Sequence, residues 1–451
     1  MFMNLKNTVF VIITSLTLVN PAFACKSEMI SALEVKEIVL RIAETVGAQF
    51  ANREIGKNIE TTLRRDIAAG KFSNQMRGEE LESLLTNRLR VLSGDNHIGL
   101  VCDPIAVKRY QTREKSQISE IERAKDEQNR AQQLAESRVE NFGIKKVELK
   151  NGYIGYLEMS YFDGHVDESK SVFAGAMNLL FGAKAIILDL RRNGGGNSKI
   201  LPLFLSYFVG PRPTHFATQF TPWKNEKTEL YTLDEVSGTR FLDKPIYILI
   251  SGTTFSLAEH VTYHLRALRN ATVIGERSYG GGRAFDPVVI DDRFFLRLPR
   301  IEIINALTNA MYEEGKGITP DVQTTSDEAP AIAYQLAISD LLKGVIDSQE
   351  RSDLDWVSRT LNSTQPAVTD TRIFNWRGVK QFGEFKFEIR NENQLWMSFR
   401  DLPWVRLRNL ENGYFYDDRS IQRQFIFNHL ENGWQVEMQR WGEKKTIIPE
   451  S

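Results

Sequence analysis

Residues 245–260 read PIYILISGTTFSLAEH, and this stretch joins a strand pattern directly to a helix pattern. The apolar run 245–250 predicts a strand that is buried within a sheet. Small and hydroxylated residues follow it, and helix-forming residues come next. Ser256 is therefore expected where a strand passes into a helix, a place where backbone N–H groups and the helix N-terminus stabilise negative charge. The simpler alternative is that Ser256 only caps the helix.

Strand and helix patterns alternate on both sides of this stretch. Asn151-Gly152 predicts a hairpin turn, and the continuous apolar run at 185–190 is typical of a strand covered on both faces. Such alternation predicts an α/β core over residues 144–350. Its expected elements are a hairpin at 144–159, helices at 168–181, 198–208, 256–268 and 328–347, and strands at 185–190, 245–250, 271–275, 294–298 and 301–304.

Two further regions flank this core. Residues 25–143 show helical periodicity, and they include a strongly charged segment at 106–141 that predicts a long, solvated helix. Six of the seven tryptophans lie beyond residue 350, and short alternating segments follow one another from 366 to 451. We expect an antiparallel β domain over 366–451 whose aromatic side chains form its core rather than a ligand platform.

The first 24 residues have the pattern of a secretory signal peptide. A basic start is followed by an apolar run at 9–19, which is too short to span a bilayer comfortably, and by Ala-Phe-Ala at 22–24. We expect cleavage after Ala24 and an exported protein, periplasmic or secreted, with no integral membrane segment after cleavage; a retained anchor is the alternative. Cys25 follows the cleavage site, but Ala22 stands where a lipobox normally carries leucine, which favours an unlipidated protein.

The chain contains only two cysteines, Cys25 and Cys102. Because an exported chain meets an oxidising compartment, a single disulfide between them is the simplest hypothesis. The formal net charge of −1 indicates neither a nucleic acid nor an anionic membrane as a partner. The sequence also lacks a cysteine–histidine cluster and a His-Glu-x-x-His motif, so it predicts no metal and no cofactor.

Four more segments carry glycine-rich or polar motifs. LDLRRNGGG at 188–196 ends a buried strand, and GERSYGGG at 275–282 follows another strand. EGKGITPDV lies at 314–322, and GDNHIGL lies far upstream at 94–100. Glycines at such positions allow the backbone to approach a ligand closely with its N–H groups.

Together, these segments resemble the C-terminal-processing (tail-specific) serine protease superfamily over residues 144–325. The shared marks are Asp-Leu-Arg-x-Asn-Gly-Gly-Gly, Ser-x-x-Glu, Gly-Glu-x-x-x-Gly-Gly and Gly-x-x-Pro-Asp, which occur here in the same order. The resemblance implies an α/β core of the crotonase/ClpP-like protease fold. It also implies that Ser256 is a nucleophile, and that backbone N–H groups of Leu257 and of Gly195, or a neighbouring glycine, form the oxyanion hole.

The branch of the superfamily matters for the catalytic base. Bacterial tail-specific proteases use a downstream lysine, but Gly281 stands at that position here, and Phe285 replaces an expected glutamine. The chain is more similar to the branch of tricorn core proteases and interphotoreceptor-retinoid-binding proteins. This similarity implies His97 as the base and Glu314 as the residue that orients it, although Asn96 departs from the motif before the histidine.

Two residues remain as second choices for these roles. His260 lies one helical turn after Ser256 and shares a helix face with it, so the residues alone favour it as much as His97. Glu313 is the alternative to Glu314, whereas Glu259 is expected to support the nucleophile helix. The remaining histidines have no motif around them: His165, His215, His264 and His429.

These observations lead to two competing functions. The first is an exported serine endopeptidase that hydrolyses a protein or peptide substrate through an acyl-enzyme, with a Ser-His-Glu arrangement. The second is an inactive protease-like module that binds an apolar ligand or a partner protein, as the similarity to the retinoid-binding repeats implies. Phe255, Phe285, Phe294 and Phe295 are candidates to line such a pocket.

Overall fold

The computed structural model describes residues 25–114, 120–311, 315–362, 371–391, 393–409, 414–417, 420–431, 433–440 and 446–449. The predicted signal peptide lies outside these ranges. The chain divides into two compact units. The first contains the chain up to Gln128, Gln219–Thr228 and Arg283–Ile303. The second contains Asn129–Thr218, Glu229–Gly282 and Ile304–Ser451.

The first unit is built on amphipathic helices. Ser31 caps the first long helix, since its hydroxyl accepts the Glu34 N–H and the Glu34 carboxylate accepts the Ser31 N–H. Helical spacing brings Leu81, Leu85 and Leu89 onto one helix face, where they are fully buried, whereas Leu84 is exposed. The helices are α2 (Ala32–Gln49), α3 (Arg53–Ala68), α4 (Gly78–Ser93) and α5 (Pro104–Glu114).

A small sheet completes the first unit. Strand β3 (Gly99–Cys102) pairs with β12 (Phe294–Asn305), which also pairs with β11 (Ala284–Val289). The tip of the hairpin formed by β7 (His215–Thr221) and β8 (Glu226–Tyr231) belongs to the same sheet, and the sequence reading missed this hairpin. The expected Cys25–Cys102 disulfide is present and ties the start of the described chain to the end of β3.

The second unit contains the predicted α/β core, except that the strands expected at 294–298 and 301–304 form β12 in the sheet of the first unit. Its six-stranded sheet has the order β13-β10-β9-β6-β5-β4. Five strands are parallel, and β4 is the antiparallel edge strand that the Asn151-Gly152 hairpin predicts. The strands are β4 (Ile144–Lys150), β5 (Ile154–Met159), β6 (Ala185–Asp189), β9 (Ile246–Ile250), β10 (Thr272–Gly275) and β13 (Val322–Gln323).

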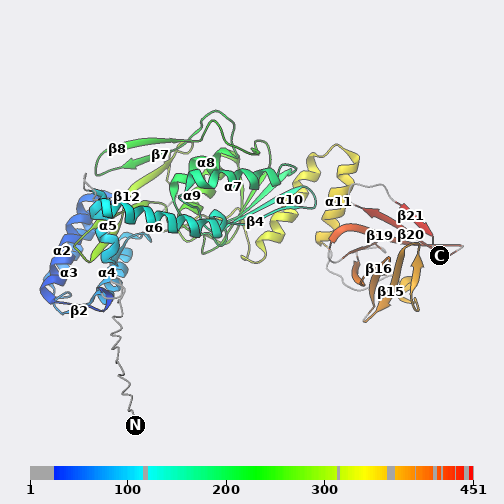
Figure 1. The fold of residues 1–451 in the computed structure, drawn as a ribbon, viewed down its shortest axis with the longest axis horizontal. Helices are drawn as coiled ribbons and strands as arrows, with labels where there is room; N and C mark the ends of the chain where they lie inside the picture. The colour runs from blue at the N-terminus through cyan, green and yellow to red at the C-terminus, as the bar shows by residue number, and fades with distance from the viewer. Residues whose placement is uncertain are drawn as a thin grey trace, which may run out of the picture. The chain divides into compact units, whose positions relative to one another are not determined.

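Helices cover this sheet, as its continuous apolar strands require. Every residue of β6 and β9 is buried. Alternate residues of these strands, such as Ile187 and Leu249, pack with α10 (Ala329–Gly344), and α11 (Ser348–Asn362) adds Leu354 to the same cluster. The other helices of the core are α7 (Val166–Leu179), α8 (Leu201–Ser206) and α9 (Leu257–Arg269) (Figure 1).

The charged segment is helical, and its second half faces solvent, whereas Ala106 and Val107 near its start are buried. Helix α5 ends at Glu114, and α6 spans Glu120–Val139, while residues 115–119 lie outside the described ranges. From Asn129 to Val139, Ser137 is the only buried residue of α6. Across the described part of the chain, no helix is both long and apolar enough to cross a bilayer.

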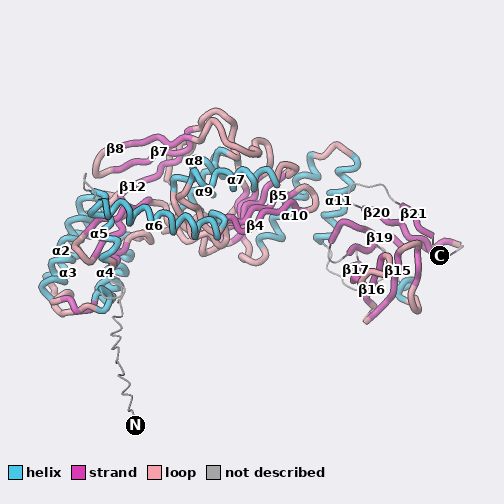
Figure 2. Tube along the Cα trace, viewed as in Figure 1, coloured by secondary structure: helices cyan, strands magenta, loops and turns pink. Residues whose placement is uncertain are grey.

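The tail forms the predicted antiparallel β domain (Figure 2). Its strands run in sequence order from β14 (Lys380–Phe382) to β21 (Thr446–Pro449). The intervening strands are β15 (Phe385–Arg390), β16 (Gln394–Phe399), β17 (Val405–Asn409), β18 (Tyr414–Asp417), β19 (Ser420–Leu430) and β20 (Gly433–Arg440). Aromatic side chains, among them Trp376, Phe387 and Phe427, form the core of the domain, which confirms that prediction.

Candidate active site

Ser256 stands at the N-terminus of α9, directly after the loop that leaves β9. Its backbone has φ 55° and ψ −120°, a conformation that non-glycine residues rarely adopt. Such strain persists only where the surrounding structure enforces it, and it is frequent at active sites. The sequence predicted the strand-to-helix junction but not this backbone geometry.

Hydroxyl groups hold the loop before Ser256 in place. The Ser251 and Thr253 hydroxyls donate to the carbonyl oxygen of Arg191 over 2.5 and 2.8 Å, respectively. The Thr254 hydroxyl donates to the carbonyl oxygen of Leu190 over 2.8 Å. The loop that carries Ser256 is therefore fixed to the segment that leads into the triple-glycine turn at 194–196.

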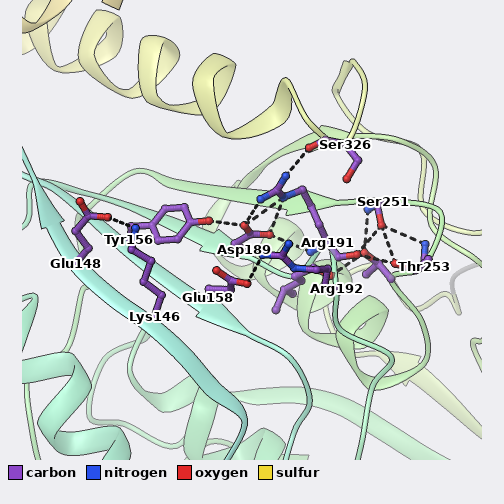
Figure 3. Close-up of polar contacts among 12 residues, drawn as sticks. Lys146, Glu148, Tyr156, Glu158, Asp189, Arg191, Arg192, Ser251, Thr253 and Ser326 are labelled. Carbon is purple, nitrogen blue, oxygen red and sulfur yellow. Dashed lines mark hydrogen bonds and ion pairs between the residues drawn. The ribbon is translucent and has the colours of Figure 1, made fainter. Parts of the chain in front are cut away.

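A buried ion pair supports that same segment. Figure 3 shows Tyr156, Asp189 and Arg191 in a continuous row of contacts. The Arg191 guanidinium donates both Nε and Nη2 to the buried Asp189 carboxylate, and Nη1 donates to the carbonyl oxygen of Ser326. Hydrogen bonding to Asp189 raises the pKa of Arg191, whereas burial and the same carboxylate raise the pKa of Tyr156. The Asp-Leu-Arg motif thus secures the strand end rather than facing a ligand.

Glu259 joins the nucleophile helix to the second glycine-rich turn. Its fully buried carboxylate accepts the N–H groups of Ser256, Gly280 and Gly281, each over 2.8 Å, and also the Ser278 hydroxyl. The N–H of Ser256 is therefore held in the position that its strained backbone requires. This arrangement agrees with the expected supporting role of Glu259.

The triple-glycine turn approaches Ser256 closely. A Cβ atom on Gly195 would lie 2.8 Å from the Cβ of Ser256 and 2.9 Å from the backbone nitrogen of Leu257. Gly195 also has φ 102°, so its conformation favours glycine as well. Its N–H donates to Asn193 Oδ1 over 2.9 Å, an acceptor that the sequence reading did not foresee.

Two other N–H groups belong to the neighbours of Ser256 and Gly195 in the chain, Leu257 and Gly196. Leu257 is the first residue of α9, where helical N–H groups lack an acceptor within the helix. Within the described residues, neither Leu257 N–H nor Gly196 N–H has an acceptor. Of the proposed oxyanion donors, Leu257 is therefore available, and Gly196 is the available neighbour of Gly195.

His97 lies in the first unit, in the loop between α4 and β3. It is buried, its N–H donates to Asp95 Oδ1 over 2.8 Å, and its Nδ1 lies 3.7 Å from the same oxygen. The ring centroids of Phe285 and His97 lie 5.8 Å apart with their planes tilted by 33°, so the residue that replaces the expected glutamine lies beside the histidine.

Asp95 is a residue that the sequence reading missed. It is fully buried and forms an ion pair with Arg283 over 3.3 Å. Burial raises the pKa of its carboxyl, and the backbone hydrogen bond from His97 and the charge of Arg283 oppose this effect. Aspartate side chains often accept the backbone N–H two residues further on in a turn, so Asp95 could have been recognised in the sequence as a turn residue.

The second-choice histidine His260 is buried in α9. Burial lowers its pKa to about 4, and its ring is hydrogen-bonded to the backbone of Gly282. His264 stacks beside it and bonds to Asn305, and burial lowers its pKa to about 3. Both rings are therefore neutral near pH 7, and His260 supports the glycine-rich turn.

The remaining predicted residues are placed as follows. Glu313 and Glu314 lie outside the described residues. Among the residues that the structure describes, no group of three or more histidine, cysteine, aspartate or glutamate side chains is arranged to hold a metal ion. His165 contacts Asp163 and Ser137, and it was assigned no role from the sequence.

Comparison with known proteins agrees with this geometry. Residues 153–324 match the model of peptidase family S41, and residues 26–142 match the N-terminal domain of peptidase S41 in eukaryotic IRBP. The chain is 25% identical over 189 residues to the carboxy-terminal processing protease CtpA of Bacillus subtilis, covering 42% of this chain and 38% of that protein. It is 28% identical over 180 residues to a carboxy-terminal-processing protease of Bartonella bacilliformis, again covering 38% of each.

Two solved structures are similar to parts of the chain. A lipoprotein from Streptococcus agalactiae is 17% identical, with a TM-score of 0.47, and the match covers 70% of this chain and 98% of that one. The photosystem II D1 C-terminal processing protease is also 17% identical, with a TM-score of 0.32 over 39% of this chain and 43% of the other. The chain spans less than two fifths of the length of the curated relatives, but family models match both its helical region and its α/β core. It therefore belongs to peptidase family S41, within the C-terminal-processing (tail-specific) serine protease superfamily.

Proposed function

We propose that this protein is an exported serine endopeptidase that acts on protein or peptide substrates. The observation that carries the proposal is the strained backbone of Ser256 at a helix N-terminus, with the triple-glycine turn packed against it. A serine in this setting presents its Oγ beside N–H groups that have no acceptor of their own. The signal peptide pattern and the Cys25–Cys102 disulfide support export.

In the proposed mechanism, Ser256 Oγ attacks the scissile carbonyl carbon while His97 accepts the hydroxyl proton. The N–H groups of Leu257 and of the triple-glycine turn stabilise the resulting oxyanion. His97 then donates its proton to the leaving amine, and the C–N bond breaks to leave an acyl-enzyme. Water, deprotonated by His97, hydrolyses the ester and restores Ser256. Glu314 is the proposed residue that orients His97.

A fluorophosphonate probe tests the nucleophile directly. Folded wild-type protein is expected to react at Ser256, whereas the Ser256→Ala variant is expected to remain unlabelled. His97→Ala is expected to fold but to lose hydrolysis of a denatured model protein by at least about 1,000-fold. Wild-type protein that folds but never reacts at Ser256 would overturn the proposal.

A second function has one specific observation in its favour. The helical region matches a domain of eukaryotic IRBP, which is consistent with a protease-like module that binds an apolar ligand. Phe255, the residue before Ser256, forms an edge-to-face pair with the half-exposed Tyr279, and the two rings offer aromatic surface for such a ligand. Co-purification of a lipid-like molecule together with absence of hydrolysis would support this function over the first.

A further inference from the structure

In the second unit, the segment 160–165 packs against two glycines, Gly196 of the triple-glycine turn and Gly143. A Cβ atom on Gly196 would lie 2.1 Å from the carbonyl oxygen of Phe162. One on Gly143 would lie 2.2 Å from the carbonyl oxygen of Tyr161. Since real Cβ atoms never come so close to a carbonyl oxygen, the segment 160–165 is held between the end of the charged region and the triple-glycine turn.

Phe162 braces the triple-glycine turn through its backbone. Its N–H donates to the carbonyl oxygen of Gly195 over 2.8 Å, and its carbonyl oxygen accepts the N–H of Asn197 over 2.9 Å. The turn can therefore shift only if the segment at 160–165 shifts with it. Because Gly195 packs against Ser256, the position of that segment also sets the distance between the turn and the nucleophile.

A buried polar cluster fixes the segment at 160–165. The Ser137 hydroxyl donates to Asp163 Oδ2 over 2.6 Å, and the backbone N–H of His165 donates to Asp163 Oδ1 over 2.6 Å. His165 Nδ1 lies 2.8 Å from the same oxygen and 3.3 Å from Ser137 Oγ. The hydroxyl of Tyr161 also bonds to Ser137, and burial raises the pKa of Tyr161.

The geometry of this cluster excludes a second hydrolytic triad. In such a triad, the carboxylate and the serine lie at opposite nitrogens of the imidazole. Here Asp163 and Ser137 both lie at Nδ1 of His165, and Ser137 bonds directly to the carboxylate. The cluster therefore holds the segment in place rather than activating a nucleophile.

We infer that Ser137, Asp163 and His165 are positioning residues for the triple-glycine turn, and through it for the oxyanion donors beside Ser256. The inference rests on the proposed peptidase function for its catalytic consequence. It also assigns a role to the end of α6: in its last eleven residues, Ser137 alone is buried, and the bonds of Ser137 tie the helix to Asp163. A shift of the oxyanion donors by about 1 Å is enough to lower kcat about 100-fold.

Two variants of the cluster and two controls test this inference. Asp163→Asn removes the charge that accepts three hydrogen-bond donors, and Ser137→Ala removes one bond while leaving a small side chain. Ser137→Thr retains the hydroxyl. Asp167→Asn makes the same chemical change four residues from Asp163, at an exposed carboxylate that pairs with Lys170.

Asp163→Asn and Ser137→Ala are expected to lower kcat about 10- to 100-fold, with KM changed less than about threefold. Ser137→Thr and Asp167→Asn are expected to retain wild-type kcat. Hydrogen exchange supplies a readout that does not depend on activity. The amides of Phe162 and Asn197 are expected to exchange about tenfold faster in the first two variants and at the wild-type rate in the controls.

The outcomes separate the inference from the proposed function. If wild type is active, and neither cluster variant changes kcat or exchange, the positioning role is wrong. An equal loss of kcat in Asp167→Asn would also overturn it, because the effect would not be specific to the cluster. If hydrogen exchange changes as expected but the wild type neither hydrolyses peptides nor reacts with fluorophosphonate, the cluster still positions the triple-glycine turn and the peptidase proposal fails.

Discussion

Replacing Glu259 by glutamine tests how the nucleophile is held. The carboxylate places two donors at each oxygen: Oε2 accepts the N–H groups of Ser256 and Gly281, and Oε1 accepts Gly280 N–H and the Ser278 hydroxyl. A glutamine has one acceptor oxygen, so its amide group must face two of these four donors in either orientation. The side chain is fully buried, and water cannot replace the lost acceptor.

The expected loss of stability follows from the two donors that no longer have an acceptor. Each buried donor without an acceptor costs about 1–3 kcal/mol, so Glu259→Gln is expected to lower the free energy of unfolding by about 2–6 kcal/mol. A strained Ser256 that is no longer held at its N–H is expected to relax, and fluorophosphonate labelling is expected to slow about 100-fold.

Urea unfolding and labelling kinetics measure these two effects. Glu276→Gln is the matched control, because this carboxylate also accepts two backbone N–H groups, those of Gly252 and Ser326. Glu276 is partly exposed, and none of its described hydrogen bonds is to a residue of α9. The control is expected to lose less than about 1 kcal/mol and to label at nearly the wild-type rate. Glu259→Gln protein with wild-type stability and labelling would show that this carboxylate does not hold Ser256.

Three further predictions concern stability. Reducing the Cys25–Cys102 disulfide, which closes a separation of 77 residues, is expected to lower the free energy of unfolding by about 4 kcal/mol, and Cys102→Ser should match the reduced protein in urea titrations. Because burial lowers the pKa of His260 to about 4 and of His264 to about 3, the unfolded chain binds protons below pH 6.5 that the folded chain excludes. The free energy of unfolding is therefore expected to have its full value above pH 6.5 and to decrease as the pH drops toward 4. The decrease should be smaller in His264→Gln, and an equal decrease in the variant and the wild type would contradict the lowered pKa of His264. A chain truncated after residue 362 is expected to keep the stability of the α/β core. Truncation after residue 349 removes the two side chains that α11 adds to the apolar cluster of the core, Leu354 and Val357, and should cost about 3 kcal/mol or more, as thermal unfolding would show.

Much of the fold followed from periodic patterns in the sequence. Continuous apolar runs predicted the central strands, since a strand covered on both faces has no polar side to display. Asn151-Gly152 predicted the hairpin of β4 and β5, which the structure confirms. The hairpin of β7 and β8 was missed because its residues are mostly exposed or partly exposed, and they show no apolar alternation.

The candidate site was less accessible to sequence reasoning. Motifs predicted Ser256 and its neighbours, but a motif does not show which acceptor each N–H group uses. Gly195 illustrates this limit: its place beside Ser256 was expected, whereas its bond to Asn193 depends on the folded loop. The roles of His97 and Glu314 remain predictions from the resemblance.

Local pattern alone was sufficient for the strand-to-helix junction at Ser256, the α/β class and the glycines of the turns, because these depend on neighbours in the chain. Only the tertiary structure decided the φ of 55° at Ser256, the four donors on Glu259 and the cluster of Ser137 with Asp163. The bonds of Glu259 and of Ser137 join segments that lie apart in the sequence. A buried carboxylate is stable only when it accepts hydrogen bonds from donors around it. When these donors come from distant segments, no periodic pattern in the sequence predicts them.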